Sequence, residues 1–396
     1  MRILFLCHRL PFPPDRGGRI RPFNILKHLS RDHDVTLASL RRAADRTAGE
    51  VELPALANRR ILVPTSELAS WLRMIAQVPT LTPSSFAYFF SPRLARLVRR
   101  ELRDAYDLVF AHSSSMAPYL VRARTPKVLD FGDMDSQKWL AYGRRKPIPA
   151  ALGYRLEGWK TERAEARLAE RFDLCTCATP AELDTLRAYG VARRTGWFPN
   201  GVDTEYFQPS PAPYDPESIC FLGRMDYYPN QEAMRWFCRE VFAPLRAQRP
   251  AMTLSIIGAA PPRSVRRLAE QPGVQVTGFV PDVRPHARRA AVSVAPLRIA
   301  RGTQNKILEC LAMGIPVVAS PLAARGTQAL PGEHLLAASH PREFIAAILR
   351  LVDDPRERRR LAEAGRARVL THHDWSASMR RLDELIDSCL ACRTRR

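Results

Sequence analysis

The chain has 396 residues, 46% of them hydrophobic and 26% charged, which is typical of a globular protein and suggests two domains. No apolar stretch reaches the ~18 residues of a transmembrane helix, and the apolar start at Met1–Leu10 lacks the cleavage site of a signal peptide, so we expect a cytoplasmic protein. The formal net charge of +21 favours an anionic partner, such as nucleic acid, anionic lipid or a phosphorylated small molecule.

Short apolar runs alternate with helical segments along the whole chain. Runs that are apolar on both faces suit buried parallel strands, and the alternation predicts repeated strand–helix–strand units. The predicted strands are Arg2–Cys7, Asp34–Ser39, Arg60–Val63, Asp107–Ala111, Lys127–Asp130, Phe172–Cys177, Ser218–Leu222, Met252–Ile257, Val274–Thr277, Ala291–Ala295 and Ile315–Ala319. The predicted helices include Ser91–Arg103, Arg155–Arg171, Ala233–Gln248, Arg342–Asp353 and Ser376–Cys389.

This order predicts an α/β protein of two doubly wound, Rossmann-like domains that face each other across a cleft. The proline-rich stretch Gln208–Glu217 cannot continue a strand or helix and is interpreted as a linker. The domains are placed at residues 1–198 and 199–375. Residues 376–396 are expected to form a helix that packs back on the first domain, because apolar residues recur there at helical spacing.

Ligands of such sheets bind outside the carboxyl ends of the strands, so residues that follow strands are candidates. Gly17 and Gly18 come after the first strand and before a helix expected near Arg21. Paired glycines let backbone amides approach an anion at a helix N-terminus. A plain tight turn is the alternative interpretation.

Two polar groups follow later strands of the first half. His112 ends the fourth run, where a neutral imidazole could accept or donate a hydrogen bond; the alternative is a bystander in a helix-capping region. Asp133 follows the fifth run together with Asp130 and Asp135. These carboxylates could bind metal or sugar hydroxyls, or they could cap the next helix.

The strongest motif extends from Arg301 to Ser320 and predicts a glycine-bearing loop, a helix and another strand. Free amides at Gly302 and Thr303 would point at an anion. Lys306 and Glu309 are three residues apart and share one face of the helix. Lys306 could bind phosphate and Glu309 could bind ribose hydroxyls, a combination that suits a nucleotide diphosphate.

With these motifs the sequence resembles the family 4 glycosyltransferases, a retaining group with the GT-B fold. The resemblance covers essentially the whole chain, in the family's order and spacing. It rests on Gly17-Gly18, Pro199–Asp203 with Phe207, Phe221–Arg224 and Glu309–Ser320. Asp130–Ser136 and Met225–Tyr227 resemble a subgroup of sugar transferases encoded with exosortase and exopolysaccharide systems.

The resemblance implies a hexosyltransferase-type, retaining enzyme of surface or extracellular polysaccharide or glycolipid synthesis, with a nucleotide diphosphate sugar donor and no metal or other cofactor. The first domain would take a lipid-linked or polysaccharide acceptor and the second the donor. His112, Arg224 and Lys306 are the expected catalytic residues. The implied contacts are Glu309 with the ribose, Gly302 and Thr303 with the diphosphate, Arg224 with phosphate, His112 with the transferred sugar, and Gly17 and Gly18 with donor phosphate and acceptor.

Two positions depart from the family's pattern. Arg301 stands where the family has the first Glu of a Glu-x7-Glu pair, so the usual contact with sugar hydroxyls lacks its carboxylate. Arg301 and Asp133 are the candidates for sugar or acceptor contact. The Lys that usually follows the phosphate-binding Arg224 is also missing, and Lys306 could replace it.

Two alternative functions are considered beside sugar transfer, together with one possible metal site. A nucleotide-sugar epimerase on the same scaffold is consistent with the absence of the family's first Glu at position 301. A nucleic-acid binder fits the charge, but zinc-finger spacing, an aromatic RNA-binding motif and a single basic tail are all missing, so we expect no nucleic acid partner. Cys389 and Cys392 resemble half of a zinc site without a second pair, so no metal site is expected.

The segment Ser91–Arg103 indicates a membrane-facing surface. It combines an arginine stripe with an apolar stripe, and the aromatic residues Trp71, Phe86, Tyr88, Phe89 and Phe90 precede it. Such a surface suits anionic lipid on the inner membrane face. A solvated basic helix over a core stripe is the alternative.

Overall fold

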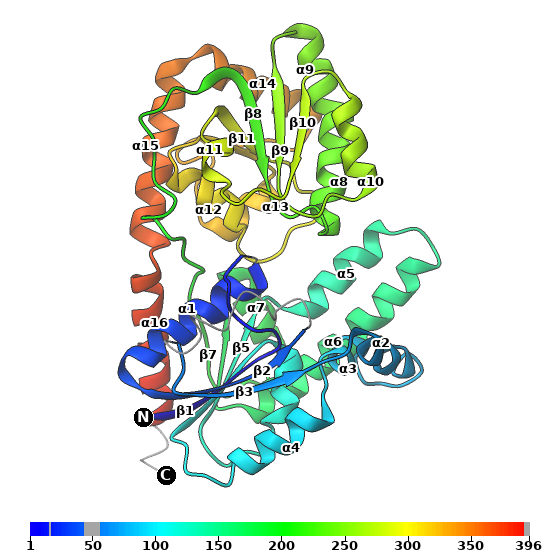
Figure 1. The fold of residues 1–396 in the computed structure, drawn as a ribbon, viewed down its shortest axis with the longest axis vertical. Coiled ribbons are helices and arrows are strands. Elements are labelled where there is room, and N and C mark those ends of the chain that lie inside the picture. The colour runs from blue at the N-terminus through cyan, green and yellow to red at the C-terminus, as the bar shows by residue number, and fades with distance from the viewer. Residues whose placement is uncertain (16, 43–55, 392–396) are drawn as a thin grey trace. The chain divides into compact units, whose positions relative to one another are not determined.

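The structure, a computed structural model, describes residues 1–15, 17–42 and 56–391. The chain forms two compact units. Unit 1 comprises Met1–Pro199 together with Met379–Arg396, and unit 2 comprises Asn200–Ser378. Each unit has its own parallel sheet, flanked by helices, and its own hydrophobic core (Figure 1).

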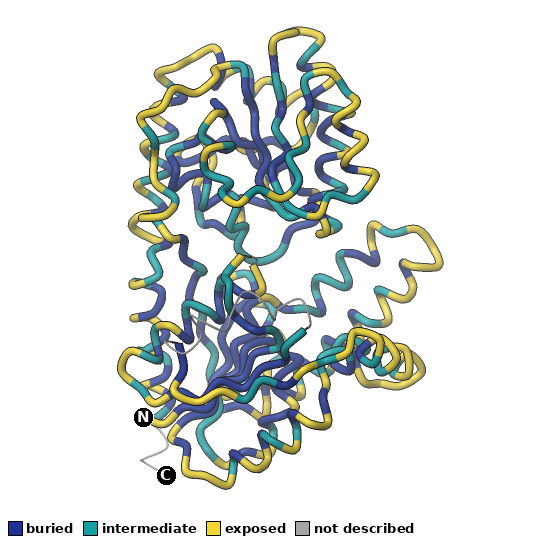
Figure 2. The backbone as a smooth tube through the Cα atoms, in the orientation of Figure 1, coloured by how far each residue is buried: buried dark blue, intermediate teal, exposed yellow. Residues whose placement is uncertain are grey.

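Unit 1 contains a sheet of seven parallel strands in the order β3-β2-β1-β4-β5-β6-β7. Its central strands are buried on both faces, which explains their unbroken apolar sequences (Figure 2). The strands are β1 (Arg2–Cys7), β2 (Asp34–Arg41), β3 (Arg59–Pro64), β4 (Leu108–His112), β5 (Lys127–Gly132), β6 (Leu174–Cys177) and β7 (Thr195–Trp197).

Unit 2 contains a sheet of six parallel strands in the order β10-β9-β8-β11-β12-β13. The strands are β8 (Asp215–Leu222), β9 (Thr253–Ile257), β10 (Val274–Gly278), β11 (Ala290–Ala295), β12 (Val317–Ala319) and β13 (Leu336–Ala337). Two parallel, doubly wound sheets confirm the predicted α/β fold class.

Helices connect the strands in both units. Those of unit 1 are α1 (Gly17–Asp32), α2 (Glu67–Ala76), α3 (Ser84–Tyr88), α4 (Pro92–Glu101), η3 (Ser114–Tyr119), α5 (Asp135–Arg145), α6 (Ala150–Arg171) and α7 (Pro180–Ala188). Those of unit 2 are α8 (Tyr228–Phe237), the π-helical turn η4 (Cys238–Phe242), α9 (Ala243–Gln248), α10 (Arg263–Arg266), η5 (Arg267–Glu270), α11 (Arg284–Ala287), α12 (Asn305–Ala312), α13 (Pro321–Ala324), η6 (Arg325–Thr327), α14 (Pro341–Asp353) and α15 (Pro355–His372). The last helix, α16 (Trp375–Ala391), begins in unit 2 and continues into unit 1.

Both sheets reverse their strand order at one point. In unit 1 the strand order reverses between β1 and β4, and in unit 2 it reverses between β8 and β11. At such a switch point the connections leave the sheet in opposite directions, which leaves room for a ligand at the carboxyl ends of the two strands. The residues that follow these four strands are therefore the ones that the fold makes available for binding.

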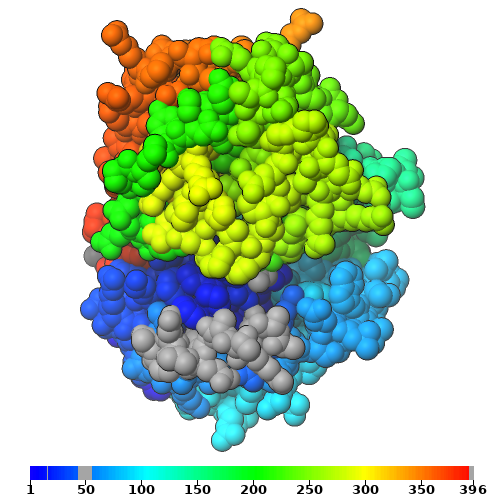
Figure 3. Space-filling view, turned by 45° about the horizontal axis from the view of Figure 1, so that its top comes forward, coloured from blue at the N-terminus to red at the C-terminus, as the bar shows by residue number. Residues whose placement is uncertain are grey.

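The proline-rich stretch is not the connection between the two units. The units meet in sequence between Pro199 and Asn200, and Gln208 already lies within unit 2. The Arg288 side chain donates a hydrogen bond to the Gln208 carbonyl, so this segment is packed on its own unit. It lies on the surface of unit 2 (green) beside the segment that contains Arg288 (yellow) in Figure 3. The prolines at positions 209, 211 and 213 lie in irregular backbone, but β8 already begins at Asp215 and includes Pro216, so the predicted linker is wrong at its end as well as in its role.

Helix α4 has an exposed basic face and an apolar face that packs on the core of unit 1. Ser91 caps it through its hydroxyl and Pro92 follows at its first position, as the sequence predicts. Leu94 and Val98 are buried in the core of unit 1, whereas the arginines of the helix are exposed. The apolar stripe of Ser91–Arg103 is therefore occupied by the protein's own core, and it cannot face a membrane.

Candidate active site

The switch point of unit 2 brings the two predicted phosphate-binding segments together. Gly223 and Arg224 directly follow β8, and the loop after β11 leads through Gly302 to α12. A Cβ atom at Gly223 would lie 2.7 Å from the Asn230 amide nitrogen and 3.1 Å from Lys306 Cε. Glycine is required here because these side chains occupy the space beside the strand end.

Lys306 is held in a defined position. Its Nζ donates a hydrogen bond of 2.8 Å to Asn230 Oδ1 and lies 5.2 Å from the centroid of the Phe221 ring. Asn230 in turn donates from Nδ2 to the Arg224 carbonyl, at 2.7 Å. A neutral amide and an aromatic ring orient the ammonium without neutralising its charge. The geometry therefore leaves a positive charge beside the end of β8.

Lys306 and Glu309 lie one turn apart in a half-buried part of α12. Burial lowers the pKa of Lys306 to about 8, against the opposing effect of the Glu309 charge. Burial also raises the pKa of Glu309 to about 7, against the opposing effect of Lys306. Both groups can therefore change their charge near neutral pH, which is typical of functional sites.

The loop before α12 contains buried polar atoms that lack a hydrogen-bond partner. Gly302 has a φ of +59°, and in the described structure neither Thr303 Oγ1 nor Asn305 Oδ1 has a hydrogen-bond partner. An unmade hydrogen bond of a buried polar atom costs about 1–3 kcal/mol. A ligand with hydroxyl or phosphate oxygens could satisfy the Thr303 hydroxyl, and one with donor groups could satisfy Asn305. The other predicted residue of this loop, Arg301, is half-buried and its carbonyl accepts a bond from Gln304.

Arg224 is engaged by an acidic neighbour. Its Nε and Nη2 donate to the two Asp226 carboxylate oxygens at 3.2 and 2.9 Å. Both side chains are partly exposed. The pair holds the guanidinium beside the strand end, but an anionic ligand would have to compete with Asp226 for it.

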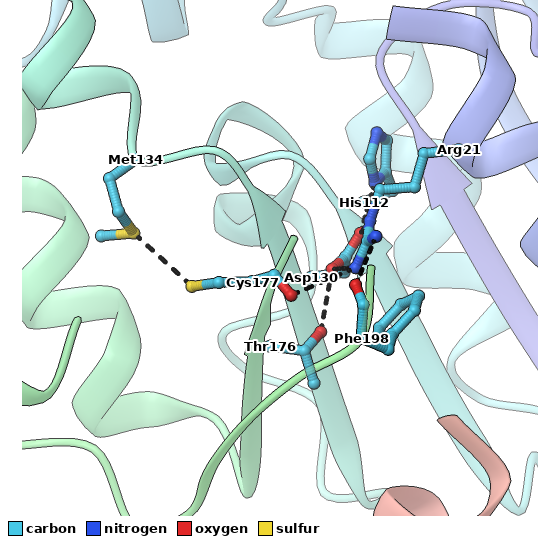
Figure 4. A network of polar contacts seen from close by, with 7 residues as sticks. All are labelled: Arg21, His112, Asp130, Met134, Thr176, Cys177 and Phe198. Atoms are coloured by element: carbon cyan, nitrogen blue, oxygen red, sulfur yellow. Dashed lines mark hydrogen bonds and ion pairs between the residues drawn. The ribbon is translucent and has the colours of Figure 1, made fainter. Parts of the chain in front are cut away.

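The switch point of unit 1 is built around a buried carboxylate (Figure 4). Asp130 accepts two hydrogen bonds of 2.8 Å from Arg21, one of 2.8 Å from His112 Nδ1 and one of 2.9 Å from Thr176. Arg21 also stacks over the Phe198 ring at 3.7 Å. Burial raises the pKa of Asp130, but the Arg21 charge and these hydrogen bonds outweigh it and hold the pKa well below its usual range.

This network fixes the orientation of His112. Because Nδ1 of His112 contacts Asp130, Nε2 is the nitrogen available to a ligand. The next residue, Ser113, has a φ of +79°, a strained conformation of the kind found at functional sites. His8, which follows β1, lies 6.1 Å from His112 between ring centroids. Burial and nearby positive charges, including those of Arg9 and His112, lower the pKa of His8 well below its usual range.

The remaining predicted residues of unit 1 differ from expectation in detail. Helix α1 begins at Gly17, not near Arg21, so Gly17 and Gly18 form its first turn. Both are exposed, and a Cβ atom at either would meet no protein atom. Asp133 is exposed and does not cap α5, whose N-cap residue is Met134. No protein contact requires glycine at positions 17 and 18.

No described group of His, Cys, Asp and Glu side chains could hold a metal ion. Cys392, half of the cysteine pair considered above, lies outside the described residues. In the described ranges, no helix combines the length and apolar character needed to cross a bilayer.

Two family models match the chain in succession. A model of glycosyltransferase family 4 matches residues 17–206, and one of the group 1 glycosyl transferases matches residues 216–354. The chain belongs to the family 4-like glycosyltransferases. Among curated proteins no sequence matches this glycosyltransferase.

Solved structures share the GT-B fold of this glycosyltransferase. A sucrose-phosphate synthase from Thermosynechococcus elongatus has 18% identity and a TM-score of 0.72, with 99% of each chain covered. HepE from Anabaena in complex with UDP has 17% identity and a TM-score of 0.71. The complex of HepE with UDP-glucose has 17% identity and a TM-score of 0.70. Each match covers 98% of this chain and 100% of HepE. At these identities the likeness establishes the fold.

Several residues of the glycosyltransferase site escaped the sequence interpretation. Asn230 and Phe221 orient Lys306, yet nothing in their sequence context indicates these contacts, and Asn230 is 76 residues from Lys306 along the chain. The Arg21–Asp130 pair spans 109 residues. The available signals were a basic residue in the first helix and the position of Asp130 at the end of a buried strand, because a buried charge requires a partner.

Proposed function

We propose that this glycosyltransferase moves a hexose from a nucleotide diphosphate donor to an acceptor, with retention of configuration at the anomeric carbon. The observation that supports this proposal best is the ammonium of Lys306, held by Asn230 and Phe221 beside the end of β8, next to the Gly302 loop. The neighbours in complex with UDP and UDP-glucose support a uridine diphosphate sugar as the donor.

The proposed roles follow from where negative charge appears. As the bond to the sugar breaks, charge develops on the leaving diphosphate. Lys306, Arg224 and the amides of Gly302 and Thr303 would stabilise that charge, and prearranged electrostatic stabilisation is usually the largest catalytic term. Glu309 would bind the ribose hydroxyls, with equal strength in the ground and transition states.

On the acceptor side, we propose that His112 contacts the transferred sugar through Nε2 and that the amides of Gly17 and Gly18 face donor phosphate and acceptor. Asp133 and Arg301 are the proposed sugar or acceptor contacts. We assign no protein nucleophile. Because cationic side chains would do the work of a metal, we propose that the reaction needs no cofactor and continues in the presence of a chelator.

The proposed pathway is surface or extracellular polysaccharide or glycolipid synthesis, in the exosortase-associated and exopolysaccharide-associated group. Asp130–Ser136 and Met225–Tyr227 support this subgroup through their resemblance to it. The acceptor would be lipid-linked or a growing polysaccharide. The enzyme would work in the cytoplasm, peripherally on the inner face of an anionic membrane, to which a chain of charge +21 is attracted.

A donor screen followed by kinetics tests the proposal. Thermal shift with UDP, other nucleoside diphosphates and their sugars selects the donor, because a ligand stabilises the folded protein by mass action. With that donor, Lys306→Ala should lower turnover ~10²–10³-fold, by analogy with the loss of an oxyanion-hole donor. Glu309→Ala should mainly weaken donor binding. Full activity of Lys306→Ala would remove the basis of the proposed site.

Two further measurements separate the alternatives. Product analysis with a labelled donor distinguishes transfer from epimerisation, since an epimerase returns the label to a nucleotide sugar. Arg301→Glu restores the family's pattern; it should reduce activity if Arg301 stabilises the diphosphate, and an unchanged rate would exclude that role.

A further inference from the structure

The α5–α6 hairpin of unit 1 exposes a stripe of large apolar side chains. Ile148 in the connection is 77% exposed, and Leu152, Leu156 and Trp159 along α6 are 56%, 44% and 40% exposed. The spacing of 152, 156 and 159 places the last three on one face of the helix. We call these four residues the hairpin surface. An exposed apolar stripe of this size indicates a binding surface.

The tip of the hairpin is also strongly basic. Arg144, Arg145 and Arg155 are exposed beside the apolar residues. From Gly143 to Leu156 the sequence contains four Lys and Arg residues and no Asp or Glu. The tip of the hairpin and the first turns of α6 thus carry positive charge alone, and the half-buried Glu157 and Glu162 follow nearer to Trp159.

Helix α2 presents a second apolar stripe in the same unit. Its outward side chains recur at helical spacing, and each is exposed over at least half of its surface: Leu68, Trp71, Leu72 and Ile75. We call these residues the α2 stripe. In the space-filling view the residues around α2 (blue) form part of the surface of unit 1 (Figure 3).

Buried polar contacts fix α2 and the following loop against α6. Lys160 of α6 donates to the carbonyls of Gln77 and Val78, just after α2, at 3.1 and 2.7 Å. Glu157 of α6 accepts hydrogen bonds from the Ser84 and Ser85 amides at 3.0 and 2.8 Å. Figure 1 shows α2 and α3 beside α6, from which the hairpin extends. The part of α6 that contains Trp159 is therefore fixed to the end of α2.

We infer that the hairpin surface and the α2 stripe dock on an anionic lipid bilayer. The apolar side chains would enter the boundary between headgroups and acyl chains, while Arg144, Arg145 and Arg155 would contact the anionic headgroups. A second copy fits less well, because a symmetric contact would bring the same arginines of two chains together and like charges oppose it. This inference rests on the peripheral membrane location in the proposed function and deepens it by naming the residues that contact lipid, and it does not depend on the donor. The surface also differs from α4, whose apolar stripe is buried.

Co-sedimentation with vesicles tests the inference on the full chain. Vesicles of phosphatidylcholine with about one third phosphatidylglycerol are expected to bind the protein at low salt, with tighter binding than pure phosphatidylcholine. Leu152→Ser combined with Leu156→Ser should reduce binding at least about tenfold, since burial of the remaining exposed area of the two side chains together contributes at least about 1.4 kcal/mol. Arg144→Ser and Arg145→Ser should each reduce it about fivefold.

Matched controls locate the effect. Phe279→Ser removes an exposed aromatic residue of unit 2, and Arg96→Ser with Arg100→Ser removes the same charge from α4. These variants should bind nearly as well as the wild type, and all variants should keep its UDP affinity and melting temperature. Brominated lipid should quench tryptophan fluorescence less in Trp159→Phe combined with Trp71→Phe.

Two results would overturn the inference. One is binding that the α4 arginines control and the hairpin residues do not. The other is no vesicle binding, together with a dimer in analytical ultracentrifugation that the Leu152 and Leu156 replacements dissociate, which would identify a second copy as the occupant.

Discussion

Lys306 is oriented by groups that leave its charge in place. Asn230 accepts its hydrogen bond and Phe221 presents a ring face, so neither removes the positive charge. A carboxylate in the place of Asn230 would hold the ammonium equally well but would cancel its attraction for a diphosphate. The arrangement combines a fixed position with a charge that Asn230 and Phe221 do not neutralise, and such a charge can give prearranged electrostatic stabilisation.

The pKa of Lys306 makes UDP affinity depend on pH. A diphosphate binds the ammonium form, and the free protein loses this proton at about pH 8. Affinity should therefore be full below pH 8 and should fall as pH rises above it, by at most tenfold per pH unit. Calorimetric titration of UDP between pH 7 and 9.5 measures this slope. Lys306→Gln should bind UDP weakly, with an affinity that does not change with pH. If the affinity of this variant falls with pH as steeply as that of the wild type, Lys306 does not cause the pH dependence.

Asp226 should act as a competitor for Arg224. The two side chains form a partly exposed ion pair, and such pairs contribute about 0.2–1 kcal/mol. Asp226→Ala should therefore raise UDP affinity by a factor of about 1.4 to 5. Arg224→Ala is the reference variant for loss of the guanidinium. If Asp226→Ala weakens binding as much as Arg224→Ala does, Asp226 positions the arginine and does not compete for it.

The Gly302 loop and η6 approach so closely that a side chain cannot fit between them. A Cβ atom at Gly326 would lie 1.9 Å from the Gly302 carbonyl oxygen, which belongs to the backbone and cannot rotate away. Gly326→Ala should displace the loop and weaken UDP binding about tenfold or more, with an overpacking cost of about 1–3 kcal/mol. Gly153→Ala, where a Cβ atom meets nothing, is the control. Unchanged UDP affinity in Gly326→Ala would mean that the loop does not form the site.

Helices α5 and α6 meet around a buried carboxyl group. Glu165 is fully buried and accepts hydrogen bonds from the Ser136 amide and the Tyr189 hydroxyl. Burial raises the pKa of Glu165 to about 8 from 4.5. The folded state therefore holds a proton that the unfolded state releases, so this group makes the free energy of unfolding fall as pH rises from 4.5 to 8.

The neutral isostere Glu165→Gln should remove that dependence. Near pH 5 the variant and the wild type should have similar unfolding free energies, and at pH 9 the variant should be more stable by several kcal/mol, about 1.4 kcal/mol for each unit of pKa shift. Urea unfolding across this range provides the measurement. Parallel pH profiles of the two proteins would contradict a protonated Glu165.

At the scale of the whole molecule, the sequence predicts the two sheets well and the connections less well. Buried parallel strands have unbroken apolar runs, so eleven of the thirteen strands were recognisable. The strands β7 and β13 have only three and two residues and show no periodicity. Prolines indicated irregular backbone correctly for residues 208–214, but Pro216 lies inside β8, and prolines carry no information on whether the backbone is packed.

The candidate site was predictable where one segment contains it. Gly302, Lys306 and Glu309 lie within eight residues of one another, so helix geometry alone relates them. Contacts such as Lys306–Asn230 and Arg21–Asp130 depend on strand order, which a single sequence does not reveal. The hairpin surface was missed because a stripe of leucines on a helix more often faces a core, as it does in α4.

The far end of α16 should stabilise elements that are distant in sequence. Leu382 and Ile386 are buried in unit 1, and Asp383 binds His28 of α1 at 2.9 Å. Leu382→Ala should cost about 2–5 kcal/mol and increase hydrogen exchange in α1 and β7. Leu370→Ala, at an exposed position of α15, should leave both unchanged. Exchange that increases only within α16 would mean that the helix does not support these elements.

The route of the chain through α16 also sets the order in which the protein can be completed during synthesis. Leu385 packs on Gly196 so closely that a Cβ atom there would lie 2.5 Å from it, and Arg381 stacks over Trp197 at 4.0 Å. A ribosome releases all of unit 2 before it releases these residues. Unit 1, although translated first, therefore keeps α1 and β7 partly uncovered while all of unit 2 is translated, and a chaperone that shields nascent apolar surface would find its target there during that period.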